Sequence, residues 1–222
     1  MKILTTTECV VRVSVVALCV GLASLAPASV SAQAPAQSSS VPTTWTIDTN
    51  HSAAGFAVRH LMVSTVRGSL GSTTGTIIYD GKNVSSIVAD VTIDVKGLST
   101  DNDGRDNHLR SADFFDAETH PTITFKSKRA EAGSDGAFKL IGDLTIRGVT
   151  KEVTLNVDAP AAVLTQPGRD GAAPTYRTGT PATTTVNRFD YGLKWNSLIE
   201  AGGGAVVGAD VKVTIDLELS RR

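Results

Sequence analysis

Apolar and polar positions alternate over long stretches of this chain. The clearest stretches are residues 89–96 (ADVTIDVK), 122–128 (TITFKSK), 149–158 (VTKEVTLNVD) and 210–219 (DVKVTIDLEL). Because successive side chains of a β-strand point to opposite faces of a sheet, each stretch predicts a strand with one buried and one solvated face. One-sided alternation also favours an antiparallel sheet, since the strands of a parallel sheet are apolar on both faces.

Weaker patterns predict further strands between these. They lie at residues 44–48, 53–60, 64–79, 138–147 and 176–188. Turns that contain glycine separate several of them, at Asp80-Gly81, at 133–136 and at Arg147-Gly148. Eight or nine strands at this short spacing are typical of an all-β sandwich or barrel.

Residues 100–118 interrupt the alternation. Asp103 is a candidate cap for a short helix that runs through Arg110, with Asp106 near the positive end of the helix dipole. Phe114 and Phe115 follow this helix. They are either a hydrophobic gate or an anchor of the helix on the barrel end, and we expect adjacent residues of so short a segment not to face the same way. Residues 160–175 and 200–208, rich in Ala, Pro and Gly, predict loops.

The first 32 residues have the pattern of a cleavable export signal. Lys2 and Arg12 give a positive start, residues 11–20 are mostly apolar, and residues 30–32 (VSA) fit a cleavage site. The apolar run is too short for a bilayer span, which needs about 20 apolar residues. We therefore expect a periplasmic protein without stable membrane insertion, with a flexible segment at 33–42 and one folded domain at 43–222.

Composition narrows the function further. Both cysteines, Cys9 and Cys19, lie in the expected signal, so the exported chain would have no disulfide, thiol nucleophile or cysteine metal site. The whole chain has 21 Lys and Arg against 22 Asp and Glu. This balance lacks the basic face that a nucleic-acid-binding protein needs, so no nucleic-acid partner is expected.

Several motifs together resemble the YceI family. They are WTIDTNHSAAGFAVRH at 45–60, VRGSL at 66–70, STDNDGRDNHLRSADFF at 99–115, HPTITFKS at 120–127, GDLTIRGVTKEVTL at 142–155 and NRFDYGL at 187–193. The resemblance covers roughly residues 45–219. It implies a lipocalin-like, up-and-down antiparallel β-barrel of about eight strands with one short helix. It also implies a bacterial periplasmic protein that binds a polyisoprenoid or a related lipid.

The chain departs from the family in two places. Residues 160–175 form a long Ala/Pro/Gly loop, and residues 69–75 (SLGSTTG) are small and polar where the family often has a Phe. These departures concern tail length and pocket shape rather than the barrel. Residues expected to contact the ligand are Phe56, Val58, His60, Val66, Leu70, Val91, Ile93, Val95, Arg105, His108, Phe114, Phe115, Ile123, Phe125, Leu144 and Ile146.

The inward aliphatic residues have two interpretations. A barrel of about eight strands is wide enough either for side chains that fill it or for one small ligand. Alternation alone does not decide between a packed core and a hollow lumen, and the family resemblance favours the lumen. Each buried CH₂ group of a lipid tail would contribute about 0.8 kcal/mol.

Polar residues offer weaker candidates. The four histidines, among them His51 and His120, lack metal-ligand spacing, and we expect no metal and no cofactor. Arg105, His108 and Arg110 could form a rim for an anionic head group. The alternative is a network around Asp106, with Arg188 and Asp190 as further members, that ties the helix to neighbouring loops.

A non-enzymatic lipid carrier is therefore the expected function. Two alternatives remain: an enzyme that acts on a small lipid-like substrate through His60 or His108, and a stress-related scaffold protein. No nucleophile motif such as G-x-S-x-G supports catalysis. The sequence leaves open which lipid is bound and whether the protein forms a homodimer.

Overall fold

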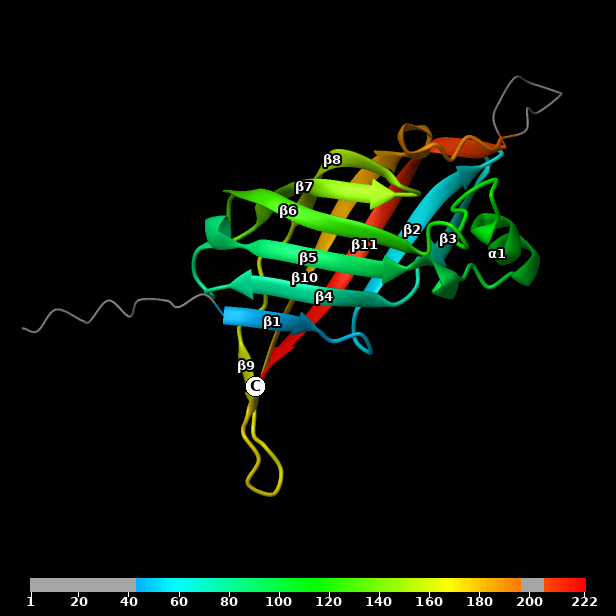
Figure 1. The fold of residues 1–222 in the computed structure, drawn as a ribbon. Coiled ribbons are helices and arrows are strands. Elements are labelled where there is room, and N and C mark those ends of the chain that lie inside the picture. Colours follow the sequence, from blue (N-terminus) through cyan, green and yellow to red (C-terminus); the bar gives the residue numbers. More distant parts are fainter. Residues whose placement is uncertain (1–42, 197–205) are drawn as a thin grey trace, which may run out of the picture. The chain divides into compact units, whose positions relative to one another are not determined.

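Eight antiparallel strands close into a ring in the computed structural model, which describes residues 43–196 and 206–222 (Figure 1). The ring consists of β1 (Thr43–Ile47), β4 (Thr73–Tyr79), β5 (Val88–Asp94), β6 (Thr122–Ala132), β7 (Phe138–Ile146), β8 (Val149–Val157), β10 (Thr175–Asn187) and β11 (Val207–Arg221). Each strand pairs with the next in this order, and β11 pairs back with β1. The predicted barrel of about eight strands is confirmed, and the described residues contain one α-helix, also as predicted.

The expected export signal (1–32) and lead-in segment (33–42) lie outside the described residues, as does most of the loop expected at 200–208. Among the helices that the structure describes, none is both long and apolar enough to cross a bilayer.

A hairpin is inserted between the first two strands of the ring. It consists of β2 (Ala53–His60) and β3 (Ser64–Ser69), and β2 pairs with the part of β11 that β1 leaves free. The short β9 (Leu164–Gln166) lies in the loop expected at 160–175 and pairs with β10. These three strands pair with strands of the ring but are not needed to close it.

The single strand expected at 64–79 is divided into β3 and β4. Gly71 lies at the division with φ of 110°, a conformation that side-chain-bearing residues rarely adopt. A Cβ atom at this position would lie 2.0 Å from the carbonyl oxygen of Asp94. The close approach of the two backbones therefore requires glycine, and it turns the chain from the inserted hairpin back into the ring.

Alternate residues of the strands face the lumen and the solvent. In β5, Ala89 and Ile93 are buried while Asp90 and Asp94 are exposed, as predicted. Two apolar clusters form the inside of the barrel. One surrounds Trp45, Phe138 and Leu155, and the other lies under the inserted hairpin and the helix.

The helix α1 (Asp103–Arg110) has the predicted span but not the predicted cap. The capping residue is Asn102, whose side chain accepts from the backbone N–H of Arg105 at 2.9 Å. Asp106 is buried and accepts from the backbone N–H of Thr100 at 2.9 Å and from the Thr100 hydroxyl. The hydroxyl contact is the main reason why the pKa of Asp106 lies below its ordinary value.

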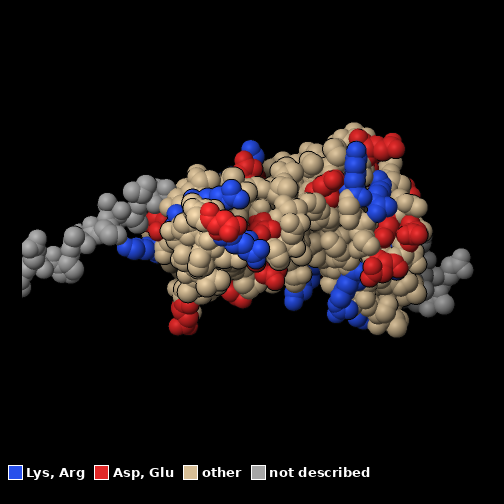
Figure 2. Space-filling model, turned by 90° about the horizontal axis from the view of Figure 1, so that it is seen from below, with Lys and Arg blue, Asp and Glu red and all other residues tan. Residues whose placement is uncertain are grey.

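Three 3₁₀-helices complete the described elements: η1 (Val84–Ser86), η2 (Val95–Gly97) and η3 (Arg188–Tyr191). On the face shown in Figure 2, basic and acidic side chains lie intermixed and are separated by broad uncharged areas. Ion pairs such as Lys128–Asp143, with Nζ 2.6 Å from Oδ1, belong to this mixed surface charge.

Candidate ligand cavity

The barrel encloses a cavity of about 130 Å³, called here the large cavity. Its wall is formed by the inward faces of the ring strands β4 to β8, β10 and β11. Aliphatic and aromatic side chains dominate this wall, and the polar side chains among the described lining residues are threonines and Tyr79. Protein interiors leave few voids larger than a water molecule, so a space of this size is unusual for a packed core.

A second cavity of about 90 Å³, the small cavity, lies toward the helix end of the barrel. Phe56 and Val58 of β2, Leu109 of α1 and the two phenylalanines 114 and 115 contribute to its wall. Four aliphatic side chains line both cavities: Leu70, Ile123, Ile146 and Val213. The two spaces are therefore neighbouring compartments of one lumen, and these four side chains, the partition, lie between them.

The size of the lumen limits what it can hold without rearrangement. An apolar cavity of about 150 Å³ is known to bind benzene, which has six carbon atoms. On this scale the large cavity offers room for about five carbon atoms and the small cavity for about four. A chain of this length is flexible and apolar, which matches the walls of the large cavity.

Arg188 places a buried positive charge at the wall of the small cavity. It is 4% exposed, and burial lowers the pKa of its guanidinium. Nε donates to the carbonyl of Gly208 at 2.9 Å, and the two terminal nitrogens donate to the carbonyls of Leu193, Trp195 (2.8 Å) and Val207 (3.2 Å). Among residues 43–196 and 206–222, no carboxylate forms an ion pair with it.

Tyr191 adds a phenol to the same wall. It is 2% exposed, and burial, with a smaller contribution from Asp190, raises its pKa to about 12. The phenol therefore stays protonated at neutral pH and can donate a hydrogen bond. Arg188 and Tyr191 line the small cavity with apolar atoms, because its interior surface is apolar like that of the large cavity.

The helix residues expected to form a rim are engaged with the neighbouring loop. Arg105 donates to the hydroxyl of Thr100 at 2.7 Å and to its carbonyl at 2.8 Å. Arg110 donates to the carbonyls of Lys96 at 3.0 Å and of Leu98. These contacts favour the interpretation of a network that ties the helix to its loop. Arg188 and Asp190, named as further members of that network, are not among these partners.

His108 lies outside both cavities. Its Nε2 is 2.9 Å from Oδ2 of Asp113, and its ring packs edge-on against Phe114 and Trp195. Phe114 is buried and Phe115 half-buried, and both border the small cavity. Both lie in the turns that follow the helix.

The expected contact residues divide into four groups. Val91, Ile93, Phe125 and Leu144 line the large cavity; Phe56, Val58, Phe114 and Phe115 line the small one; and Leu70, Ile123 and Ile146 line both. The remaining five line neither cavity: His60, Val66, Val95, Arg105 and His108. Val95 instead belongs to the packed cluster under the helix, with 1% exposure.

Several lining residues were missing from the expected set. The inward residues Val213, Ile215, Leu217 and Leu219 of β11 line the large cavity, as do Leu155 and Val157 of β8. The period-two pattern that predicted these strands already marked their inward faces, and it could have identified these residues. No pattern in residues 187–193 marked Arg188 or Tyr191 as lining residues.

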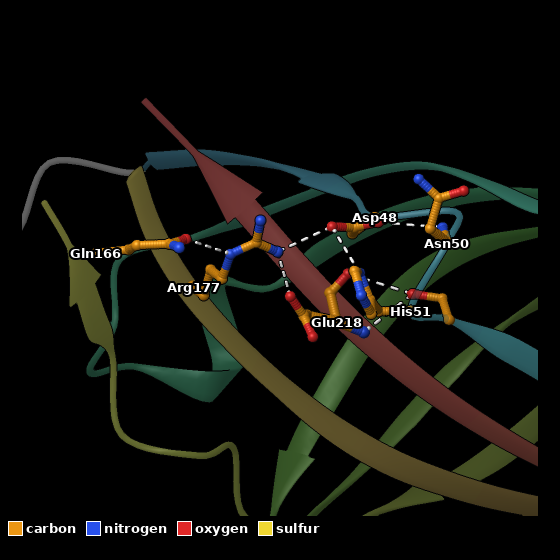
Figure 3. A network of polar contacts seen from close by, with 7 residues as sticks. Asp48, Asn50, His51, Gln166, Arg177 and Glu218 are labelled. Carbon is orange, nitrogen blue, oxygen red and sulfur yellow. Dashed lines mark hydrogen bonds and ion pairs between the residues drawn. The ribbon is translucent and has the colours of Figure 1, made fainter. Parts of the chain in front are cut away.

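A polar network joins the strands at the opposite end of the barrel from the helix (Figure 3). Arg177 of β10 donates to Oδ2 of Asp48 at 2.8 Å and to Glu218 of β11. His51 Nδ1 lies 3.1 Å from the same Asp48 oxygen. The bond from Arg177, followed by that from His51, lowers the pKa of Asp48 to about 2.

This network has the residue types of a metal site. Ligand atoms of Asp48, His51 and Glu218 all lie within 4.8 Å of one another. However, the guanidinium of Arg177 already contacts both carboxylates, so it occupies the position and neutralises the charge that a cation would use. The network is best described as an ion-pair contact that fastens the β1–β2 corner to β10 and β11.

Comparisons with known proteins agree with this architecture. The profile of the YceI-like domain matches residues 45–219. A UPF0312 protein of Staphylococcus aureus (strain bovine RF122 / ET3-1) is 37% identical over 178 residues, which cover 80% of this chain and 98% of that protein.

Two solved structures share the fold. The YceI protein of Campylobacter jejuni aligns with a TM-score of 0.60 at 29% identity, covering 74% of this chain and 90% of that one. A domain from Saccharophagus degradans, described as polyisoprenoid-binding and implicated in plant cell wall breakdown, aligns with a TM-score of 0.56 at 18% identity. That alignment covers 80% of this chain and 98% of the domain.

Proposed function

This chain belongs to the YceI-like domain family, and from that premise we propose that it is a lipid-binding protein that carries an apolar tail inside its barrel. The observation that carries the proposal is the large cavity of about 130 Å³ with its apolar wall. The polyisoprenoid-binding description of the domain from Saccharophagus degradans supports the same ligand class. Polyisoprenoids, isoprenoid quinones and fatty-acid-like lipids all have tails of the required kind.

The energy of such binding is sufficient. About nine methylene groups, the room in both cavities together, would contribute about 7 kcal/mol from apolar burial at about 0.8 kcal/mol each. Loss of translational and conformational freedom offsets part of this, so the net affinity is smaller. A tail longer than the large cavity would have to pass the partition into the small cavity.

The two compartments together suit the tail of the ligand. The wall of the large cavity contains no charged residue among those described. The small cavity also presents apolar atoms to its interior, because the guanidinium of Arg188 is engaged with four backbone carbonyls. The head group of the ligand is therefore expected outside both cavities.

The proposal also covers location and chemistry. The signal-like pattern at residues 1–32 supports export to the periplasm, and N-terminal sequencing of exported protein should begin at Gln33. A carrier of insoluble lipids needs no catalytic group, and we propose binding without turnover.

A substitution that fills the lumen with a larger side chain tests the proposal. Ala182 is 8% exposed and lines the large cavity, so Ala182→Phe would occupy space that the tail requires. Thr185 is exposed on the same strand, and Thr185→Phe is the matched control outside the barrel. Native mass spectrometry of protein from a bacterial host should show a bound lipid on the wild type and on Thr185→Phe, and little or none on Ala182→Phe. A wild type without bound lipid, which also takes up no added farnesol or long-chain fatty acid, would overturn the proposal.

A further inference from the structure

The tip of the β2–β3 hairpin exposes three consecutive apolar side chains. Leu61, Met62 and Val63 are 41%, 56% and 80% exposed. Single exposed apolar residues are common, but three in a row at the end of a hairpin form a concentrated apolar projection. These three residues are called the apolar tip.

The backbone of the apolar tip is unfavourable for the residues it contains. Leu61 and Met62 have φ of 50° and 58°, in the left-handed region that hairpin turns usually fill with Asn and Gly. Such strain costs of the order of a kilocalorie or more for each residue and is often found at functional positions. Turn formation does not explain the choice of Leu and Met here.

The apolar tip is firmly held. The guanidinium of Arg59 donates to the carbonyl of Met62 at 2.6 Å and to the hydroxyl of Thr65 at 3.0 Å. The backbone N–H of Leu61 donates to the carbonyl of Val206 at 2.8 Å. The tip is therefore presented by the hairpin rather than folded back onto the barrel.

Cations lie on the outward face of the same hairpin, starting two residues before the tip at Arg59 and reaching back to the level of Ala57, about 13 Å from Leu61 along the strand. Ala57 pairs with Arg67 on one side and with Lys212 on the other, so the two cations flank it in one row. Arg59 is two residues from Ala57 on the same face. In the described part of the chain, these three cations form no ion pair, and Asp210 is the carboxylate of β11 nearest to them in sequence.

We propose that the apolar tip and this row of cations dock the protein onto the surface of an anionic lipid bilayer. Apolar side chains that enter the interface, together with cations that meet anionic head groups, are the two components of such peripheral binding. Binding of this kind is reversible and needs no membrane-spanning segment.

Docking would bring one end of the lumen to the membrane. Val58 and Val207 line the small cavity, and Val207 pairs with His60, directly before the apolar tip. The membrane contact does not require a lipid inside the barrel, so it can be tested independently of the proposed function.

The test uses co-sedimentation with vesicles of phosphatidylglycerol and phosphatidylcholine, compared with vesicles of phosphatidylcholine alone. The wild type should bind the anionic vesicles more tightly. The double variant Leu61→Asn/Met62→Gly should weaken this binding about tenfold or more, because it removes the apolar contact. Asn-Gly is the preferred pair for this turn, so the melting temperature should stay equal or rise, and lost binding cannot reflect unfolding.

Two further variants separate the contributions. Arg67→Gln/Lys212→Gln should weaken binding to anionic vesicles roughly fivefold for each cation and leave binding to phosphatidylcholine unchanged. The matched control is Val163→Asn/Leu164→Asn in the β9 arm, where the two residues are 48% and 65% exposed. The strand β9 pairs with residues 175–177 of β10. That part of β10 lies at the end of β11 far from the tip, and β11 has 15 residues, which corresponds to a strand length of roughly 50 Å.

Three results would overturn the proposal. They are no binding of the wild type to anionic vesicles, unchanged binding of Leu61→Asn/Met62→Gly, and loss of binding in the β9 control instead. Native mass spectrometry of Leu61→Asn/Met62→Gly distinguishes this proposal from the proposed function. A variant that no longer binds vesicles but still carries a lipid would separate the two.

Discussion

Arg188 is the charged residue among those that line the lumen. Its side chain acts as a clamp that fastens two backbone segments to each other. It contacts four backbone carbonyls, two of them at the start of β11 and two in the segment after η3. Arg188→Met should destabilise the fold by about 3 kcal/mol or more, because buried carbonyls would lose their donors. Urea unfolding measures this change, and Arg188→Lys should recover only part of it because an ammonium lacks the planar fork of a guanidinium. Equal stability of the wild type and Arg188→Met would contradict the clamp.

Asp48 gives a prediction about pH. Its pKa is lowered from 3.8 to about 2, so folding stabilises the ionised form of the carboxylate. This contribution is fully present above the ordinary pKa and is lost as the pH falls from about 4 to about 2. Asp48→Asn should therefore unfold at a lower temperature than the wild type at neutral pH, and the difference should shrink through that window. Melting temperatures measured across this pH range test it, and a difference that stays constant with pH would exclude Asp48 as its source.

Single residues also show where sequence reasoning reached its limit. Ala89 and Ile93 could be placed inside the barrel, because the period of two determines the face of every residue in a regular strand. Arg188 and Tyr191 could not, because they belong to a 3₁₀-helix whose contacts lie up to 20 residues away. Whether an Arg is buried there depends on carbonyls that local sequence does not reveal.

The division of strand 64–79 at Gly71 gives a prediction at the scale of elements. Gly71→Ala should destabilise the protein by more than about 2 kcal/mol, since its Cβ would meet the Asp94 carbonyl and its φ would be strained. Gly81 is the matched control, because its φ is 81° but no atom lies within 4 Å of a Cβ there. Gly81→Ala should cost only about 1 kcal/mol. Equal unfolding free energies for the two variants would show that the close approach at Gly71 does not matter.

The elements were predicted with uneven success for a physical reason. Strands such as β2 and β8 follow from local periodicity, which is present in the sequence, and α1 lies where the alternation stops. The break at Gly71 and the cap at Asn102 depend on the path of the backbone in three dimensions. A glycine within an alternating stretch does not by itself predict such a break, because the break depends on which backbone approaches the glycine in three dimensions.

At the scale of the whole molecule, the closure of the ring was the least predictable feature. β11 pairs with β10 along its length and, on its other edge, with β1 at one end and β2 at the other. The contacts with β1 and β2 join residues 147 to 174 positions apart in the chain, and alternation specifies which face is inward but not which strands become neighbours. The family resemblance, rather than the pattern itself, indicated a barrel instead of a sandwich.

Whether the barrel has a packed core or a hollow lumen also depends on the whole molecule. The same inward Val, Ile and Leu residues can meet across a barrel or leave a space, depending on the diameter of the ring. In this ring of eight strands they leave two compartments that share the partition residues. Ligand capacity is thus a property of the assembled barrel.

The electron density inside the barrel of protein purified from a bacterial host, without added ligand, tests the central claim most directly. The account predicts elongated density along the large cavity, which continues past the partition into the small cavity when the tail is long. A map in which side chains fill the lumen, or in which the lumen holds only separate water molecules, would contradict it.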